Sequence, residues 1–168
     1  MTIRSLRQDD LDSVAAINQL NVGDVGPISD HQLALVLSSS RMAFAVENDE
    51  GNVVGFALII DAACGHLTPR AEWALQAGAA DLHLERVAFD MTYSGQGLGL
   101  ALYDEIDARI LEVAAGVGAG TTTLSSLVCL DPPNQHSIGF HSSRGFDVLD
   151  RATFDNTTIG VACKTYVV

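Results

Sequence analysis

The sequence predicts a single mixed α/β domain. Segments with strand patterns recur along the chain between segments with helical spacing, in the order β-α-α-β-β-β-α-β-α-β-β. Of the 168 residues, 48% are apolar and 18% are charged, which is enough apolar side chain for one sizeable core. No internal repeat, low-complexity tract or linker interrupts the sequence, so we expect one domain over residues 1–168.

The first half of the chain has the pattern of a strand, two helices and a hairpin. A strand around Thr2–Leu6 precedes a helix that begins near Asp9 and Asp10, with apolar residues at helical spacing: Leu11, Val14, Ala15 and Ile17. Ser29 and Asp30 are suited to cap a second helix. Strands at 42–47 and 53–60 surround a turn at 48–52 and predict a hairpin. Residues 61–80 are rich in alanine and glycine, and either a loop or a short helix fits them.

The second half begins with a strand at 81–89 whose polar and apolar residues alternate. The period of two places His83, Glu85 and Val87 on one face, and the opposite face holds Leu82, Leu84, Arg86 and Ala88. After a turn at 95–99, a helix is indicated by an apolar stripe: Leu98, Leu102, Ile106, Ile110 and Val113. A strand at 121–130, a helix after Pro132-Pro133-Asn134 and strands at about 146–154 and 158–167 complete the order.

The charge and cysteine content narrow the function classes. The chain has 9 basic and 21 acidic residues, a net charge of −12, which disfavours nucleic-acid and membrane-surface partners and favours cationic ones. No apolar segment has the length of a membrane span, and early aspartates interrupt any signal-peptide pattern. Three separated cysteines, Cys64, Cys129 and Cys163, suggest neither a disulfide framework nor a metal site, so we expect a cytoplasmic protein without a bound metal.

The segment from Phe89 to Gly99 joins a strand to the most clearly patterned helix through alternating glycines. Such a turn aims backbone N–H groups at one point next to the positive end of a helix, which suits a pyrophosphate. The dinucleotide pattern GxGxxG fails at Leu100 and Leu102, and the ATP-binding loop needs a lysine, whereas the only lysine is Lys164. Nicotinamide and ATP sites are therefore disfavoured, and the alternative is that the glycines only form a tight turn.

Two blocks of sequence, Ser94–Gly99 (SGQGLG) and Asn134–Phe146 (NQHSIGFHSSRGF), resemble the GNAT superfamily of acyl-CoA-dependent N-acyltransferases. Residues 94–99, Ser-Gly-Gln-Gly-Leu-Gly, are similar to its signature [QR]-x-x-G-x-[GA] at every position except Ser94. Residues 134–146 are similar to the segment N-x-x-[AS]-x-x-[FL]-[YH]-x-x-x-G-F at every marked position, and residues 85–90 resemble the family's fourth strand. The resemblance covers the whole chain and implies a mostly antiparallel central sheet flanked by about four helices.

The resemblance implies that the chain binds acetyl-CoA or coenzyme A. Backbone N–H groups from Gly95 to Leu100 would hold the pyrophosphate, and the main chain at 87–89 would pair with the pantetheine arm and polarise the thioester carbonyl. Asn134 would bind the pantetheine, or would only cap a helix. Arg144 is the nearest basic residue for the 3′-phosphate. The complete set of expected coenzyme-binding residues is Val87, Ala88, Phe89, Ser94, Gly95, Gln96, Gly97, Leu98, Gly99, Leu100, Asn134, Ser137, Phe140 and Arg144.

Three residues are the candidate catalytic groups. His83 and Glu85 share a strand face where the resemblance places the general base, and Glu85 would raise the proton affinity of His83 if the side chains approach. Alternatively, Glu85 pairs with an arginine and His83 is only a polar wall residue. His141 takes the position of a tyrosine that protonates the leaving thiolate in the family; otherwise it is a surface or cap-adjacent histidine near the end of a short helix. Tyr93, Tyr103 and Cys129 are weaker candidates.

The function that these residues predict is N-acetyl transfer from acetyl-CoA to a primary amine by direct transfer in a ternary complex. The acidic surface favours a small cationic amine or a peptide terminus. The alternative is a non-catalytic acyl-CoA-binding or interaction domain of the same fold. Acceptor contacts are expected in the first two helices with residues 18–30, at 61–80 and in the last hairpin. The candidates there are either acceptor contacts or solvated loop residues: His31, His66, Arg70, Glu72 and Trp73. The apolar tail at 164–168 would pair across a homodimer or end a sheet.

Overall fold

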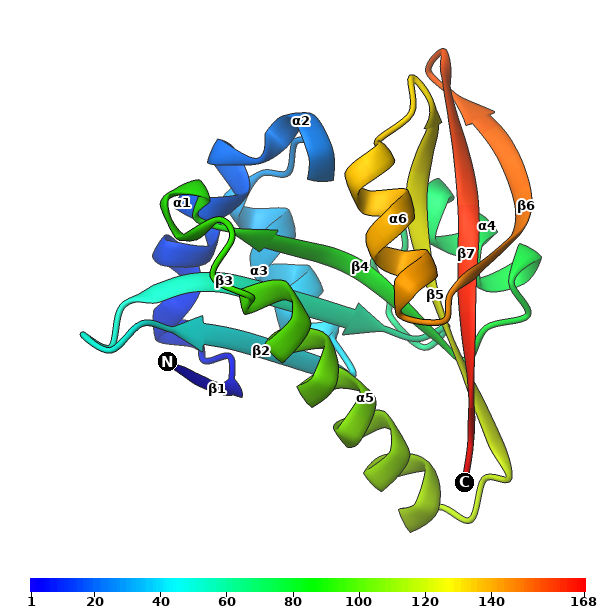
Figure 1. Ribbon diagram of the computed structural model, residues 1–168, viewed down its shortest axis with the longest axis horizontal. Helices are drawn as coiled ribbons and strands as arrows, with labels where there is room; N and C mark the ends of the chain where they lie inside the picture. The colour runs from blue at the N-terminus through cyan, green and yellow to red at the C-terminus, as the bar shows by residue number, and fades with distance from the viewer. The chain divides into compact units, whose positions relative to one another are not determined.

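The computed structural model describes residues 1–168 and shows a mixed α/β fold with seven strands and six α-helices (Figure 1). The elements are β1 (Thr2–Ser5), α1 (Leu11–Leu20), α2 (Val22–Val25), α3 (Asp30–Ser39), β2 (Met42–Glu47), β3 (Val53–Ile60), α4 (Pro69–Ala77), β4 (Leu82–Phe89), α5 (Leu98–Gly116), β5 (Thr121–Asp131), α6 (Gln135–Ser143), β6 (Asp147–Phe154) and β7 (Thr157–Val167). Single 3-10 turns lie at Gln8–Asp10 and Met91–Tyr93. None of the helices has the length and apolar character that a membrane crossing needs.

The strands follow one another in the order β1-β2-β3-β4-β5-β7-β6. The pairs β1–β2, β2–β3, β5–β7 and β6–β7 are antiparallel, and β4 pairs with β5 in parallel. This arrangement confirms the mostly antiparallel mixed sheet expected from the sequence. The chain forms two compact units: the first contains residues 1–60, 64–66 and 86–109, and the second contains residues 61–63, 67–85 and 110–168.

The first unit is built on the hairpin of β2 and β3. Helices α1 and α3 contact each other and β3, and their buried residues, Val14, Ile17, Leu33 and Val36, are those that the helical spacing predicts to face a core. Ser29 caps α3 by accepting a hydrogen bond from the backbone N–H of Gln32. The hairpin strands have the same bounds as predicted, because alternation and a turn motif are both local signals.

An ion network in the first unit ties β1 to the start of α1. The Asp10 carboxylate accepts two hydrogen bonds from the Arg4 guanidinium, at 2.7 and 2.9 Å, and one from the backbone N–H of Arg7 at 2.7 Å. Arg4 also donates to Glu47 at 2.7 Å. The hydrogen bond from Arg4 lowers the pKa of Asp10, with the Arg7 amide acting in the same direction against burial.

We expect Asp10→Asn to lower the free energy of unfolding by about 2 kcal/mol at pH 7, because it replaces a carboxylate that accepts two charge-assisted hydrogen bonds from Arg4. The folded pKa of Asp10 lies below its unfolded value, so its contribution is complete above about pH 4 and is lost as the pH falls through the folded pKa. Urea unfolding at several pH values measures both effects. The exposed neighbour is the control: Asp9→Asn should change little, and an equal loss in both variants would contradict the role of the network.

The second unit has helices on opposite faces of β5 and β7. Residues Val161 and Cys163 of β7 pack with Ala74 of α4, and Leu127 of β5 lies against the same cluster. On the other face, Ser126 of β5 contacts His141 of α6. Because successive strand residues point to opposite faces, α4 and α6 cover the two sides of these strands. Figure 1 shows α6 in front of β5 and α4 behind it.

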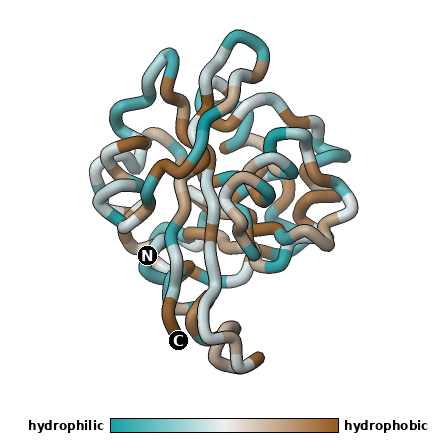
Figure 2. Tube along the Cα trace, turned by 90° about the vertical axis from the view of Figure 1, so that its right-hand side faces the viewer, coloured by the Kyte–Doolittle hydropathy of each residue, from teal (hydrophilic) through white to brown (hydrophobic).

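Several details of the elements differ from the sequence prediction. Helices α2 and α4 are additional to the expected order of elements. Helix α4 shows that residues 61–80 contain a short helix and are not only a loop. Thr68 caps α4 by accepting a hydrogen bond from the backbone N–H of Ala71. The buried stripe of α5 ends at Ala114, 3% exposed, rather than at Val113, because a straight helix favours a step of four here. The apolar C-terminal end seen in Figure 2 completes β7, where Val167 pairs with Thr121, so the tail ends a sheet.

Candidate active site

The glycine turn in the first unit presents free backbone donors at the start of α5. Gly95 and Gly97 have φ of +76° and +77°, values that side-chain-bearing residues rarely adopt. The backbone N–H groups from Gly95 to Leu100 donate to no other group of the chain, and the first helical hydrogen bond is donated by Ala101 to the Gly97 carbonyl. Residues 94–97 are exposed. This geometry fits an anion such as a pyrophosphate.

Strand β4 leads into that turn and carries residues of both units. Val87 and Phe89 are half-buried, whereas Ala88 is 4% exposed. The Phe89 carbonyl accepts a hydrogen bond from the Asn21 side chain at 2.9 Å, which fixes the end of the strand to the end of α1. The predicted pantetheine-pairing residues therefore lie on one strand segment that runs directly toward the glycine turn.

His83 and Glu85 lie in the second unit and face each other as the period of two predicts. His83 Nε2 is 3.7 Å from Glu85 Oε2, and His83 Nδ1 is 2.9 Å from the Ser125 hydroxyl. The net change in the proton affinity of His83 is the opposite of the expected rise. His83 is 1% exposed, and burial lowers its pKa to about 4 despite the hydrogen bond with Ser125. His83 is thus a neutral side chain that holds its position beside the Glu85 carboxylate.

The depressed pKa of His83 makes stability depend on pH. The unfolded chain binds a proton near pH 6.5, and the folded chain does so only near pH 4, so stability falls as the pH drops through this window. We expect His83 to account for a loss of about 3 kcal/mol between these limits. Urea unfolding of the wild type and His83→Gln measures it: the variant should lose less stability on acidification, and parallel pH profiles would contradict the assignment.

His141 of α6 is also buried in the second unit, 6% exposed, so it is not a surface histidine; it lies in the last turn of α6, where the cap-adjacent alternative places it. Its Nε2 lies 3.1 Å from the Ser126 hydroxyl and its Nδ1 lies 2.8 Å from the Ser137 carbonyl. The ring meets Phe140 and Phe146 edge to face. Burial lowers the pKa of His141, and the Ser137 carbonyl partly opposes this effect.

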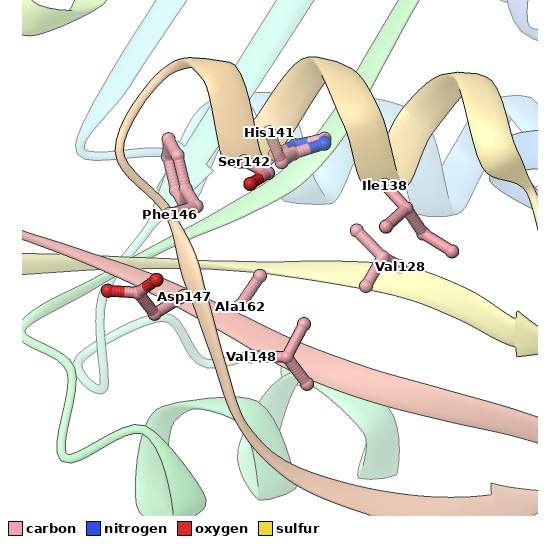
Figure 3. A pocket seen from close by; sticks show the side chains of 8 residues that line it. All are labelled: Val128, Ile138, His141, Ser142, Phe146, Asp147, Val148 and Ala162. Atoms are coloured by element: carbon pink, nitrogen blue, oxygen red, sulfur yellow. The ribbon is translucent and has the colours of Figure 1, made fainter.

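A pocket of about 140 Å³ adjoins His141 on the α6 side of the sheet (Figure 3). The lining comes from β5, α6, β6 and β7 and is mostly apolar: Val128, Ile138, His141, Ser142, Phe146, Asp147, Val148 and Ala162. In Figure 3, Ile138 and Val128 approach each other across it, while the His141 ring lies along the helix. The sheet side of α6 is therefore accessible next to His141.

The remaining predicted residues of α6 lie at its two ends. Asn134 caps the helix, because its side chain accepts from the backbone N–H of Ser137 at 3.0 Å. Arg144 is the residue after the last turn, where its backbone N–H donates to the Phe140 and His141 carbonyls. The cap role of Asn134 is confirmed, and its coenzyme contact stays a prediction. Arg144 is separated from Asn134 by the full length of α6.

Arg86 is a buried residue of β4 that the sequence analysis did not single out as a structural contact. Its guanidinium is buried with the side chain 7% exposed, and Nη1 lies 2.9 Å from Asn18 Oδ1 and from the Val25 carbonyl and 3.0 Å from the Gly26 carbonyl. Together with Asn21, Arg86 fastens α1 and α2 to β4. A signal was present, because Arg86 shares its predicted strand face with three apolar residues.

Two of the expected acceptor segments meet in the second unit. Trp73 of α4 packs edge to face on Phe154 at the end of β6, with ring centroids 5.7 Å apart. Arg70 lies over the same Phe154 ring at 5.6 Å and forms an ion pair with Asp155 at 3.3 Å. Helix α4 and the β6–β7 turn region are therefore in contact, and their role in binding an acceptor stays a prediction.

Comparison with known proteins identifies the family of the chain. The sequence model of the acetyltransferase (GNAT) family matches residues 13–146, and the chain belongs to this family. It is an acyltransferase, and its family uses acyl-CoA as the acyl donor. No curated protein sequence matches the chain.

Solved structures share the fold along nearly the whole chain. Ribosomal-protein-S18-alanine N-acetyltransferase from Escherichia coli is 21% identical with a TM-score of 0.71, over 99% of this chain and 94% of that one. A GNAT-like decarboxylase, GphF, in complex with isobutyryl-CoA is 18% identical with a TM-score of 0.70, over 97% and 98%. A chimera of spermidine N-acetyltransferase from Vibrio cholerae is 14% identical with a TM-score of 0.63, over 96% and 93%. At these identities the likeness shows the fold alone.

Proposed function

We propose that the chain transfers an acetyl group from acetyl-CoA to a primary amine. The observation that carries the proposal is the glycine turn, whose free N–H groups from Gly95 to Leu100 stand at the start of α5 in a chain of the acetyltransferase family. These groups would hold the coenzyme pyrophosphate, and the main chain at 87–89 would pair with the pantetheine. The turn fits this anion although Ser94 replaces the basic or amide residue of the signature.

A cationic amine is the acceptor that the charge of the chain favours. The net charge of −12 attracts cations and concentrates them near the surface. Two solved neighbours are named for a ribosomal-protein alanine and for spermidine, which are both amines. Among the segments expected to contact the acceptor, residues 18–26 of the first unit are held by Arg86. In the second unit, Arg70, Trp73 and Phe154 form a surface of their own.

The side chains of the second unit divide the proton transfers between them. An amine arrives as an ammonium ion and must lose one proton before it attacks the thioester. Glu85, whose side chain is 9% exposed, would take that proton and release it to solvent, and the neutral His83 would hold the carboxylate in place. His141 would handle the second proton, which leaves the attacking nitrogen and reaches the sulfur.

Release of free thiol tests the proposed function. The purified chain is incubated with acetyl-CoA and, in turn, spermidine, an aminoglycoside and a peptide with a free amino terminus. We expect thiol release above the hydrolysis background with at least one amine, together with an acetylated product by mass spectrometry. Binding of acetyl-CoA without turnover on any amine would instead support a non-catalytic acyl-CoA-binding domain.

A further inference from the structure

The two nitrogens of His141 have different and fixed roles. A carbonyl oxygen only accepts hydrogen bonds, so Nδ1, 2.8 Å from the Ser137 carbonyl, carries the ring proton. In the neutral ring, Nε2 is then the acceptor, and the Ser126 hydroxyl, 3.1 Å away, donates to it. The basic nitrogen of His141 therefore points at Ser126.

The surroundings keep this arrangement in place. His141 is 6% exposed and Ser126 is 4% exposed, and the rings of Phe140 and Phe146 stand edge to face against the imidazole. Burial favours the neutral ring, whereas the Ser137 carbonyl would stabilise an imidazolium once it forms. The imidazole of His141 is therefore neutral at rest and can accept a proton, and the Ser137 carbonyl would stabilise the imidazolium that results.

Ser126 lies where two parallel strands stop pairing. The β4–β5 ladder joins Leu82, His83 and Leu84 to Leu124, Ser125 and Ser126, although β4 continues to Phe89 and β5 to Asp131. In the proposed function, the pantetheine pairs with β4 at 87–89, beyond the end of this ladder. Ser126 is therefore the last residue of β5 that pairs with β4 in the second unit.

We infer that the Ser126 hydroxyl relays a proton between the reacting atoms and His141. The relay rests on the proposed function and adds a catalytic residue to it. As the amine nitrogen bonds to the thioester carbonyl carbon, it gives a proton to Ser126 Oγ, whose own proton moves to His141 Nε2. When the carbon–sulfur bond breaks, the imidazolium returns a proton through Ser126 to the sulfur, and the thiol leaves. The proton that the relay takes from nitrogen is delivered to sulfur, so Ser126 and His141 end in the protonation states in which they began.

Direct exchange between His141 and the substrate is disfavoured because both ring nitrogens already have partners. Ser125, the neighbouring hydroxyl on β5, is no substitute. It lies 2.9 Å from His83 Nδ1, and its place on the strand puts it on the face opposite Ser126. Two consecutive serines of one strand therefore contact two histidines on opposite faces, and only Ser126 connects to His141.

Nitrogen NMR of the histidine rings tests the resting state in the chain without ligand. At pH 7 we expect His141 to be neutral with the proton on Nδ1, and we expect Ser126→Ala to shift the Nε2 resonance while leaving that tautomer in place. An imidazolium, or a ring protonated on Nε2, would overturn the relay.

Kinetics with acetyl-CoA and an amine accepted in the thiol-release assay tests the transfer. We expect Ser126→Ala to lower kcat about 100-fold with the KM for acetyl-CoA within about twofold, and Ser126→Thr to restore most of kcat. The proton inventory in mixed H₂O and D₂O should bow for the wild type, because two protons move. Thr123→Val is the matched control, since it also removes a hydroxyl from β5, one that faces Thr165. Melting temperatures show that each variant is folded.

The outcomes separate the relay from the function on which it rests. Full activity in Ser126→Ala overturns the relay alone, and so does a loss that Ser126→Thr does not recover while the variant stays folded. A wild-type chain that binds acetyl-CoA and acetylates no amine overturns the proposed function, and the relay falls with it.

Discussion

Replacing His141 by glutamine is expected to lower kcat about 100- to 1000-fold while acetyl-CoA still binds. The Gln side chain can accept the hydrogen bond from Ser126 through its amide oxygen, as Nε2 does, but an amide does not take up a proton at neutral pH. The substitution therefore removes the proton acceptor and keeps most of the side-chain packing. Steady-state kinetics with acetyl-CoA and an accepted amine measures the loss.

The control for this variant is His136→Gln on the same helix. His136 is exposed in the first turn of α6 and has no place in the proposed chemistry, so its activity should match that of the wild type. Unchanged kcat in His141→Gln would exclude His141 from proton transfer. A parallel loss of coenzyme affinity would instead show that the ring supports the binding site.

Replacing Arg86 by methionine is expected to lower the free energy of unfolding by about 3 kcal/mol. Methionine preserves much of the apolar stem but removes the donor from three acceptors: the Asn18 side chain and the Val25 and Gly26 carbonyls. These groups join α1 and α2 to β4, so amide exchange of residues 18–26 should also accelerate. Urea unfolding and hydrogen–deuterium exchange measure the two effects.

Arg86→Lys and an exposed arginine complete the test. Lysine keeps the charge but offers a single nitrogen on a different stem, so we expect an intermediate loss of stability. Arg41 is exposed at the start of the first hairpin, and Arg41→Met should stay within about 0.5 kcal/mol of the wild type. Equal stability of Arg86→Met and the wild type would contradict the role of Arg86 in fastening α1 and α2 to β4.

The order of the strands and most helices could be predicted because their signals are local. Alternation at 81–89, capping by Ser29 and Asn134 and the turn at 48–52 depend on neighbours within a few residues. Helix α2 has four residues, which is too short for any periodic pattern, and α4 lies in an alanine- and glycine-rich segment with a weak pattern.

The candidate site was only partly predictable, because its electrostatics depend on burial. The sequence placed His83 beside Glu85, but its low pKa arises from a near-complete loss of solvent contact that no spacing reveals. The partnership of Ser126 with His141 joins β5 to α6, and only the fold brings these together. Two adjacent serines inside a strand of apolar and β-branched residues were the available signal.

Calorimetric titration with acetyl-CoA tests the central claim most directly, because the coenzyme must bind at the glycine turn for any of the proposed chemistry to occur. We expect a roughly micromolar dissociation constant for the wild type. Asparagine tolerates a positive φ better than a β-branched residue does, so Gly97→Asn should bind nearly as well and Gly97→Val about tenfold more weakly. Absence of binding by the folded wild type, or equal affinity in all three chains, would contradict the assignment of this turn.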